Sequence, residues 1–237
     1  MPLLGLAAML LSFDIDPEAI DEHDQWHTHE HLPERLSIPG FRRGTRWVAT
    51  EGKPRYMVLY EVESLHVLAS EAYLARLNNP TPWAIRMMPH YRGMRRGLCA
   101  VVGSFGLGQG SVAALVRFTA EEARATELQQ WLLQEVLPAC PQLPGLPSAH
   151  LLRGAQAATM TNEQRIRGAD QGVDSAVIFT GYDCGAVNAI AKNLIGAGGL
   201  PDNGAVEFAF AIYRSDYSLA AAEFSANPAD QAVDTTR

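Results

Sequence analysis

Apolar and polar residues alternate along this chain in segments of two kinds, short ones with strand character and longer ones with helical spacing. Runs rich in β-branched and aromatic residues, bounded by turn residues, predict strands. We expect these strands at residues 3–13, 41–49, 56–62, 97–105, 112–118, 146–153, 176–180 and 206–213. Apolar residues three and four positions apart predict helices. We expect these helices at residues 17–35, 64–77, 83–88, 121–137 and 185–195. The predicted order is therefore βαββαβ, followed by the same order again.

The second half of the chain repeats landmarks of the first half at a constant offset of 105 residues. The matched pairs are Trp26 with Trp131, Leu32-Pro33 with Leu137-Pro138, Pro39-Gly40 with Pro144-Gly145, and Phe13 with Phe118. A match of this kind without gaps indicates a tandem repeat. We therefore expect an α+β fold of two ferredoxin-like βαββαβ units.

This repeat divides the chain into parts. Residues 1–105 are expected to form the first ferredoxin-like repeat, residues 111–217 a degenerate second repeat, and residues 218–237 a flexible tail. A polar insertion at 157–172 is expected to form a mobile loop. The histidines that stand out in the sequence belong to the first repeat.

His23, His27 and His31 are four residues apart in a predicted helix, so they lie roughly on one face of it. The offset of 105 pairs them with apolar residues of the second helix: Leu128, Leu132 and Val136. We therefore expect the imidazoles to face the sheet, whereas His29 is expected to be solvated. Because an unsatisfied buried polar group costs about 1–3 kcal/mol, this arrangement predicts a polar cavity between helix and sheet. The alternative is a less buried helix with its histidines at a wet edge.

Composition and charge exclude several classes of function. The formal net charge is -7 and hydrophobic residues make up 47% of the chain, which argues against a nucleic-acid or polybasic membrane surface. The apolar segment 1–11 lacks a basic start and is too short to span a bilayer, so we expect a buried strand and a cytoplasmic protein. The Gly-rich segment 103–110 lacks the P-loop lysine, which argues against nucleotide binding. The widely spaced Cys99, Cys140 and Cys184 are expected to be buried thiols.

Four short motifs of the first hundred residues are similar to a known group of proteins. They are Trp-His-x-x-Glu-His-Leu-Pro-Glu-Arg at 26–35, Ile-Pro-Gly-Phe at 38–41, Tyr-Met-Val-Leu-Tyr-Glu at 56–61 and Asn-Pro-Thr-Pro-Trp at 79–83. The chain thereby resembles the EthD-like branch of the dimeric α/β-barrel superfamily. The resemblance implies two ferredoxin-like sheets that pair within one chain and enclose a cavity. It also implies that His31, which precedes Leu-Pro, is the site residue that matches the motif best. Because Val136 replaces this histidine in the second half, we expect one functional cavity rather than two equivalent ones.

Related branches of that superfamily include muconolactone isomerases, polyketide cyclases, cofactor-free monooxygenases and haem-degrading monooxygenases. The hypothesis favoured by the sequence is a cofactor-independent enzyme of isomerase, cyclase, lyase or monooxygenase type. His31 and His27 are its candidate acid/base groups, because imidazole gains and loses a proton near neutral pH. The candidate substrate-binding residues are His23, Arg46, Tyr60, Trp83 and His90.

Two other hypotheses remain open at this point. The first is a haem- or metal-dependent enzyme on the same scaffold, since His27 and His31 have a spacing that can hold one ion. His23 and His31 are separated by roughly 12 Å of helix rise, so all three cannot share a metal, and we expect neither metal nor cofactor. The second is a non-catalytic binding or stress protein for an apolar ligand. The expected partner is a small aromatic or polyketide-like molecule, with a homodimer as an open alternative to a monomer.

Overall fold

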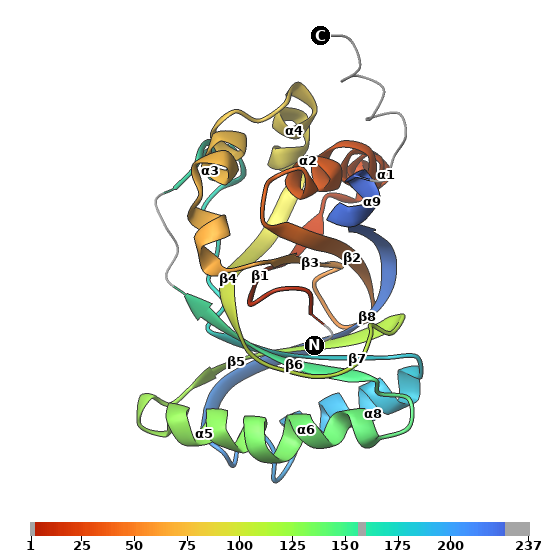
Figure 1. Cartoon of the computed structure of the whole chain (residues 1–237), viewed down its shortest axis with the longest axis vertical. Helices are drawn as coiled ribbons and strands as arrows, with labels where there is room; N and C mark the ends of the chain where they lie inside the picture. Colours follow the sequence, from red (N-terminus) through yellow and green to blue (C-terminus); the bar gives the residue numbers. More distant parts are fainter. Residues whose placement is uncertain (1–2, 156–159, 226–237) are drawn as a thin grey trace.

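A computed structural model describes residues 3–155 and 160–225 of the chain, and a closed antiparallel barrel lies at its centre (Figure 1). Its strands are β1 (Ala7–Ile15), β2 (Phe41–Glu51), β3 (Tyr56–Val62), β4 (Tyr91–Gly106), β5 (Val112–Ala120), β6 (Ser148–Ala155), β7 (Ser175–Gly181) and β8 (Ala205–Ala220). They follow one another around the barrel in the order β1-β3-β2-β8-β5-β7-β6-β4. Every neighbouring pair is antiparallel. The predicted α+β class is confirmed.

Helices cover the barrel on two opposite sides (Figure 1). On one side lie α1 (Ile20–Trp26), α2 (Leu32–Leu36), α3 (Glu71–Asn78), α4 (Pro82–Met87) and α9 (Ala221–Ser225). On the other side lie α5 (Ala125–Trp131), α6 (Leu137–Ala139) and α8 (Cys184–Ile195). None of the helices in the described ranges is long and apolar enough to cross a membrane.

The two halves of the chain contribute equal shares to the barrel. The first half supplies four adjacent strands in the order β4-β1-β3-β2, and the second half supplies β8-β5-β7-β6. Two seams close the barrel, β2 against β8 and β4 against β6. The bounds of β5 and α5 lie 105 residues after those of β1 and α1.

A π-helical turn separates α1 from α2, and another separates α5 from α6. They span His27–His31 and Leu132–Val136, and the amides of Leu32 and Leu137 close them by donating to the carbonyl oxygens of His27 and Leu132. In both places a proline follows immediately, Pro33 and Pro138. Proline has no N–H to donate and its ring displaces the preceding turn, so the helix widens before it.

Three apolar clusters hold these layers together. One lies between the first-half helices and the sheet and includes Phe13, Trp26 and Tyr60. A second fills the equivalent space of the second half, and a third occupies the inside of the barrel, where Trp47 and Leu115 are buried. Side chains therefore cover both the outer and the inner face of the barrel. This explains why β3 is buried along its whole length.

The structure corrects several predicted boundaries. β1 begins at Ala7 rather than at residue 3, β4 begins at Tyr91 rather than at 97, and β8 continues beyond 213 to Ala220, where α9 follows. The helix predicted at 64–77 is two segments, because Ser70 is extended and caps α3 by accepting from the Tyr73 amide.

The insertion predicted as a mobile loop contains a helix, α7 (Asn162–Arg167), with a capping box at Thr161 and Gln164. Paired caps of this kind stabilise a short helix. Residues 157–159 of the insertion and 226–237 of the predicted tail lie outside the described residues.

Candidate active site

Three imidazoles are buried where the helical stretch containing α1 and α2 packs against the sheet. His23, His27 and His31, hereafter the histidine cluster, are 0%, 1% and 7% exposed, whereas His29 is exposed. Successive rings of the cluster lie 5.5 Å apart between centroids. The wide π turn helps to place His27 and His31 above one another on the sheet-facing side. The predicted orientation is therefore observed, and a wet edge is wrong for these side chains.

The sheet beneath the histidine cluster is aromatic. Four rings are buried there: Phe13, Tyr56, Tyr60 and Tyr91. The His23 ring lies 4.8 Å from Tyr56, and the indole of Trp26 lies 4.3 Å from the His31 ring, both between centroids. The Trp26 Nε1 donates to Glu30 at 3.0 Å, which fixes the indole. Offset ring contacts of this kind favour particular orientations, so the imidazoles are held rigidly.

His23 has hydrogen-bond partners at both ring nitrogens. Its Nδ1 lies 3.0 Å from Asp24 Oδ1, and its Nε2 lies 3.4 Å from the Tyr91 hydroxyl. An ionised carboxylate can only accept, so Nδ1 carries the proton and Nε2 accepts from Tyr91. Asp24 also accepts from the Tyr56 hydroxyl at 2.8 Å. Burial lowers the pKa of His23, and the bond to Asp24 opposes that shift. Because both of its ring nitrogens are engaged, His23 can hold neighbouring side chains in place but has no free nitrogen for proton transfer.

His27 and His31 are different, because each keeps a buried nitrogen without a partner. The Nδ1 atoms of both rings form no hydrogen bond within the described part of the chain. His27 Nε2 lies 3.4 Å from the Tyr60 hydroxyl, a long hydrogen bond. Native proteins pair nearly all buried polar side-chain atoms, so an unpaired one calls for an explanation, such as a bound molecule.

Burial sets the protonation state of these two rings. Loss of solvent lowers the pKa of His27 and of His31 well below the ordinary value, and the charge of Arg35 lowers both further. Burial raises the pKa of Tyr60, so its phenol keeps its proton. At neutral pH both imidazoles are therefore neutral, and a neutral imidazole has one nitrogen that accepts a proton and one that donates.

A small cavity adjoins His31. Its volume is about 30 Å³, which is roughly the share of liquid volume that one water molecule takes. Its walls include Arg35 and Arg96 from the first half and Glu163 from α7. A polar cavity is therefore present at His31, but it is small, and neither His23 nor His27 lines it.

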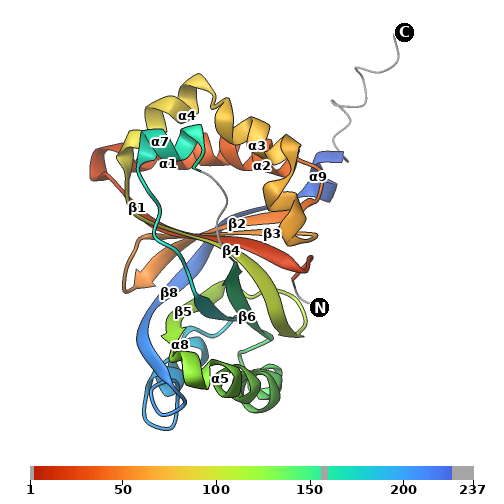
Figure 2. The same ribbon diagram turned by 90° about the vertical axis from the view of Figure 1, so that its left-hand side faces the viewer.

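Helix α7 of the insertion lies beside the first-half helices (Figure 2), and its Glu163 lines this cavity. Arg35 and Glu163 are 1% and 4% exposed, and the Arg35 Nη2 donates to Glu163 Oε1 at 2.5 Å. The Asn162 side chain donates to the Asn78 carbonyl at 2.7 Å, which ties α7 to the end of α3. Burial by itself would lower the pKa of Arg35, but Glu163 raises it. A buried ion pair thus joins the candidate site to α7.

The sequence analysis did not identify Arg35 or Glu163. Arg35 is the last residue of the motif 26–35 and follows His31 by about one helical turn. This spacing is a signal by which Arg35 could have been predicted as a neighbour of His31. Glu163 lies 128 residues further along the chain. No local pattern in the insertion relates Glu163 to a helix of the other half.

The structure places Arg46 and Trp83 at the margins of the histidine cluster. Arg46 is 4% exposed, and it donates to Asp216 at 2.7 Å and to the Asp24 carbonyl at 3.1 Å. Its guanidinium is therefore held by the protein and reaches the cluster through Asp24. Trp83 is half-buried on α4 and donates its Nε1 to Glu22 at 3.0 Å.

His90 belongs to another group of side chains. It pairs with Asp16 at 3.2 Å, and its side chain is 36% exposed. Among the described residues, His90, Asp16 and Glu18 are the set of three potential metal ligands whose donor atoms converge within 4.8 Å. The histidine cluster offers no such convergent set of three in those residues, so it does not fit a metal ion held by three protein ligands.

The eight-stranded antiparallel barrel with helices on both sides is the fold of the dimeric α/β-barrel class. Solved structures with this fold include an anthrone oxidase-like protein, with TM-score 0.63 and 12% identity over 93% of this chain and 96% of that one. A protein described as a candidate monooxygenase from Fusobacterium nucleatum has TM-score 0.60 and 8% identity over 92% and 96%. A mutant chlorite dismutase from Candidatus Nitrospira defluvii has TM-score 0.54 and 13% identity over 89% and 91%. The sequence matches no family model and no curated protein.

Proposed function

We propose that this protein is a small-molecule enzyme in which neutral His31 acts as a general base on an aromatic or polyketide-like ketone, without a cofactor. The observation that carries the proposal is the buried, unpartnered Nδ1 of His31 beside a cavity and an aromatic sheet. Because the ring is neutral at neutral pH, one of its nitrogens is free to accept a proton from an activated C–H group.

His27 is proposed to stabilise the enolate that forms. If the Tyr60 hydroxyl donates to His27 Nε2, the neutral ring carries its proton on Nδ1. That N–H has no protein acceptor in the described ranges, so it is available to the oxygen of the substrate. Donors placed in advance where charge develops are a strong source of catalysis. His23, held by Asp24 and Tyr91, is proposed to position the other two rings.

The substrate is proposed to enter beneath α7, because the Arg35–Glu163 pair forms part of the wall of the cavity beside His31. Opening this pair would join the cavity to the aromatic surface of the sheet. Arg46, Tyr60 and Trp83 are proposed to border the enlarged pocket. His90 remains a weaker candidate, because its partner is Asp16.

Oxygenation is the reaction class that we favour for this site. The structural neighbours include an anthrone oxidase-like protein and two proteins described as candidate monooxygenases. In such a reaction His31 would remove a proton from the methylene carbon between two aromatic rings, and the resulting carbanion would react with O₂. The balanced change converts the CH₂ group and O₂ into a carbonyl group and water. Isomerisation, cyclisation and elimination would begin with the same proton removal.

We also propose that the chain is a tandem pair of ferredoxin-like units, residues 1–105 and 111–217, followed by a tail at 218–237, in the EthD-like branch. The equal offset of β1 and β5, of α1 and α5, and of the two π turns supports the repeat. The first half carries the proposed site, because Leu128, Leu132 and Val136 stand where the histidines do.

A haem enzyme is the principal competing function. The residues of the cluster fit it poorly, since a metal-bound imidazole normally donates its other N–H to an acceptor, and the Nδ1 atoms of His27 and His31 have none in the described chain. His150, the histidine of the second half, bonds Ser104 at 2.9 Å, and burial lowers its pKa to about 3. It has no contact with the histidine cluster in the described residues.

The test is turnover of anthrone by purified protein after dialysis against a chelator. We expect O₂ uptake matched by formation of anthraquinone, and a protein sample without visible absorption. A coloured sample that loses turnover when haem or metal is removed would support the competing function. Ligands that raise the melting temperature without any conversion would support a non-catalytic binding protein.

A further inference from the structure

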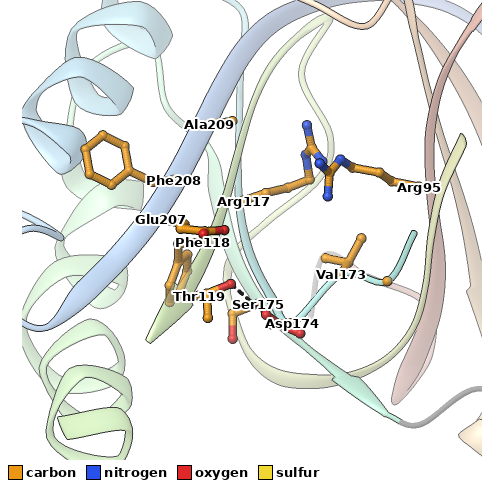
Figure 3. Close-up of a pocket in the computed structure, with 11 residues that line it drawn as sticks. Arg95, Arg117, Phe118, Thr119, Val173, Asp174, Ser175, Glu207, Phe208 and Ala209 are labelled. Atoms are coloured by element: carbon orange, nitrogen blue, oxygen red, sulfur yellow. Dashed lines mark hydrogen bonds between the residues drawn. The ribbon is translucent and has the colours of Figure 1, made fainter. Parts of the chain in front are cut away.

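One end of the barrel contains a second cavity, separate from the histidine cluster. Its volume is about 230 Å³, somewhat below the usual range for drug-sized ligands. Arg95 of β4 and Arg117 of β5 reach into it, and Thr119, Asp174 and Ser175 form part of its wall (Figure 3). β4 and β5 are not neighbours in the barrel. The two arginines therefore converge from different parts of the sheet.

The guanidinium groups of Arg95 and Arg117 point toward one another in this cavity (Figure 3). Within the described ranges, neither group forms a side-chain hydrogen bond or has a carboxylate within ion-pair distance. The nearby acidic groups do not neutralise them: Asp174 accepts from the Thr119 hydroxyl at 2.6 Å, and Glu207 is exposed. The pair is thus uncompensated by the protein.

Several other arginines of this chain are paired with carboxylates: Arg35, Arg43 and Arg46 each reach one at 2.5–2.7 Å. The chain also has an excess of acidic residues, with a net charge of -7. Two partly buried cations held side by side repel each other, and burial followed by the charge of Arg95 lowers the pKa of Arg117. Such a pair destabilises the free protein unless an anion joins it.

We propose that Arg95 and Arg117 form a binding site for a small dianion, a phosphate or a short dicarboxylate, at the end of the barrel. Each planar guanidinium can bind one pair of anionic oxygens with two parallel hydrogen bonds. A dianion between the two groups would cancel the repulsion. The hydroxyl group of Ser175 lies in the same wall and offers a further hydrogen-bond donor.

The site is built on rigid elements that also border the histidine cluster. Arg96, the residue after Arg95, belongs to the other face of β4 and donates to Tyr73 at 3.0 Å. The segment leading out of the insertion pairs with the same strand, since the Arg96 amide donates to the Gln171 carbonyl at 2.9 Å. The proposed anion site and the proposed active site therefore lie on opposite faces of one strand, with separate ligands.

Calorimetric titration of the full chain with sodium phosphate and, separately, with succinate at constant ionic strength tests the proposal. We expect one of the two dianions to bind. R95Q or R117Q is expected to weaken that binding by about tenfold or more, because each variant loses hydrogen bonds between a charged guanidinium and the anion. R153Q serves as the control, because Arg153 is an exposed arginine that contacts Gln129. A heat of binding measured with phosphate but not with succinate identifies a phosphate site. A heat of binding measured with succinate but not with phosphate identifies a dicarboxylate site.

A second measurement separates a binding role from a structural one. Removing one member of a repelling pair is expected to leave the melting temperature of the ligand-free protein unchanged or higher. The dianion is expected to raise the melting temperature of the wild type and of R153Q, but not of R95Q or R117Q. The proposal is overturned if the wild type binds neither dianion, if both variants bind as the wild type does, or if both lose stability without ligand.

Discussion

His31→Gln is expected to lower kcat for anthrone by about 10²–10⁴-fold, the usual contribution of a positioned general base. Glutamine keeps much of the size and the hydrogen-bonding capacity of the imidazole, but it cannot take up a proton in this pH range. The ring of His31 packs on Trp26, so His31→Ala would add a packing defect to the loss of the base. We therefore regard the glutamine variant as the cleaner test and the alanine variant as a supporting one.

The matched control is His29→Gln, two residues away on the exposed side of the same turn. We expect it to keep the kcat of the wild type. Steady-state kinetics and thermal unfolding should be measured on both variants, so that a folding defect is recognised. A His31→Gln protein that folds and retains more than half of the wild-type kcat would rule out His31 as the base.

Glu163→Gln is expected to have the largest effect on stability. It leaves the buried Arg35 guanidinium with Glu34 as its remaining carboxylate, at 3.0 Å. Breaking a buried pair by removing one partner costs about 3–5 kcal/mol. Because Glu34 still compensates part of the charge, we expect the lower end of that range. For a chain of this size the melting temperature should then fall by roughly 6–12 °C, as measured by calorimetry.

The same substitution should also release α7, since Glu163 ties that helix to the first half. Amide hydrogen exchange in α7 is expected to become faster than in the wild type, whereas exchange in β3 should stay slow. Arg165→Gln is the control, because Arg165 is exposed on the same helix. Equal exchange and equal melting temperatures in the wild type and Glu163→Gln would contradict the idea that the ion pair docks the insertion.

The sequence predicted the placement of the histidine cluster for a physical reason. A helix that packs on a sheet repeats its apolar positions, so the aliphatic stripe of one half indicates which positions face the sheet in the other half. His23, His27 and His31 occupy those positions and are buried. Tyr60, a candidate substrate-binding residue, lies on the same face of β3 as Tyr56, because residues four positions apart in a strand point to the same side.

Contacts between distant segments were not predictable in this way. Glu163 lies in a polar insertion whose local pattern indicates a loop, and its partner Arg35 belongs to the other half of the chain. Arg95 and Arg117 meet only because the sheet closes into a barrel. Their strands give no sign of this closure, which depends on the pairing of β2 with β8 and of β4 with β6. Both sites therefore needed the three-dimensional arrangement.

The proposed mechanism requires His27 and His31 to be buried, neutral imidazoles, and two-bond ¹H–¹⁵N NMR of the histidine rings measures their protonation directly. The variants His27→Gln and His31→Gln assign the signals. Because burial lowers the pKa of both groups, we predict that their rings stay neutral as the pH falls from about 7.5 to about 5.5, a range that spans the usual pKa of a histidine side chain. Protonation of His27 and His31 within this range would contradict the account.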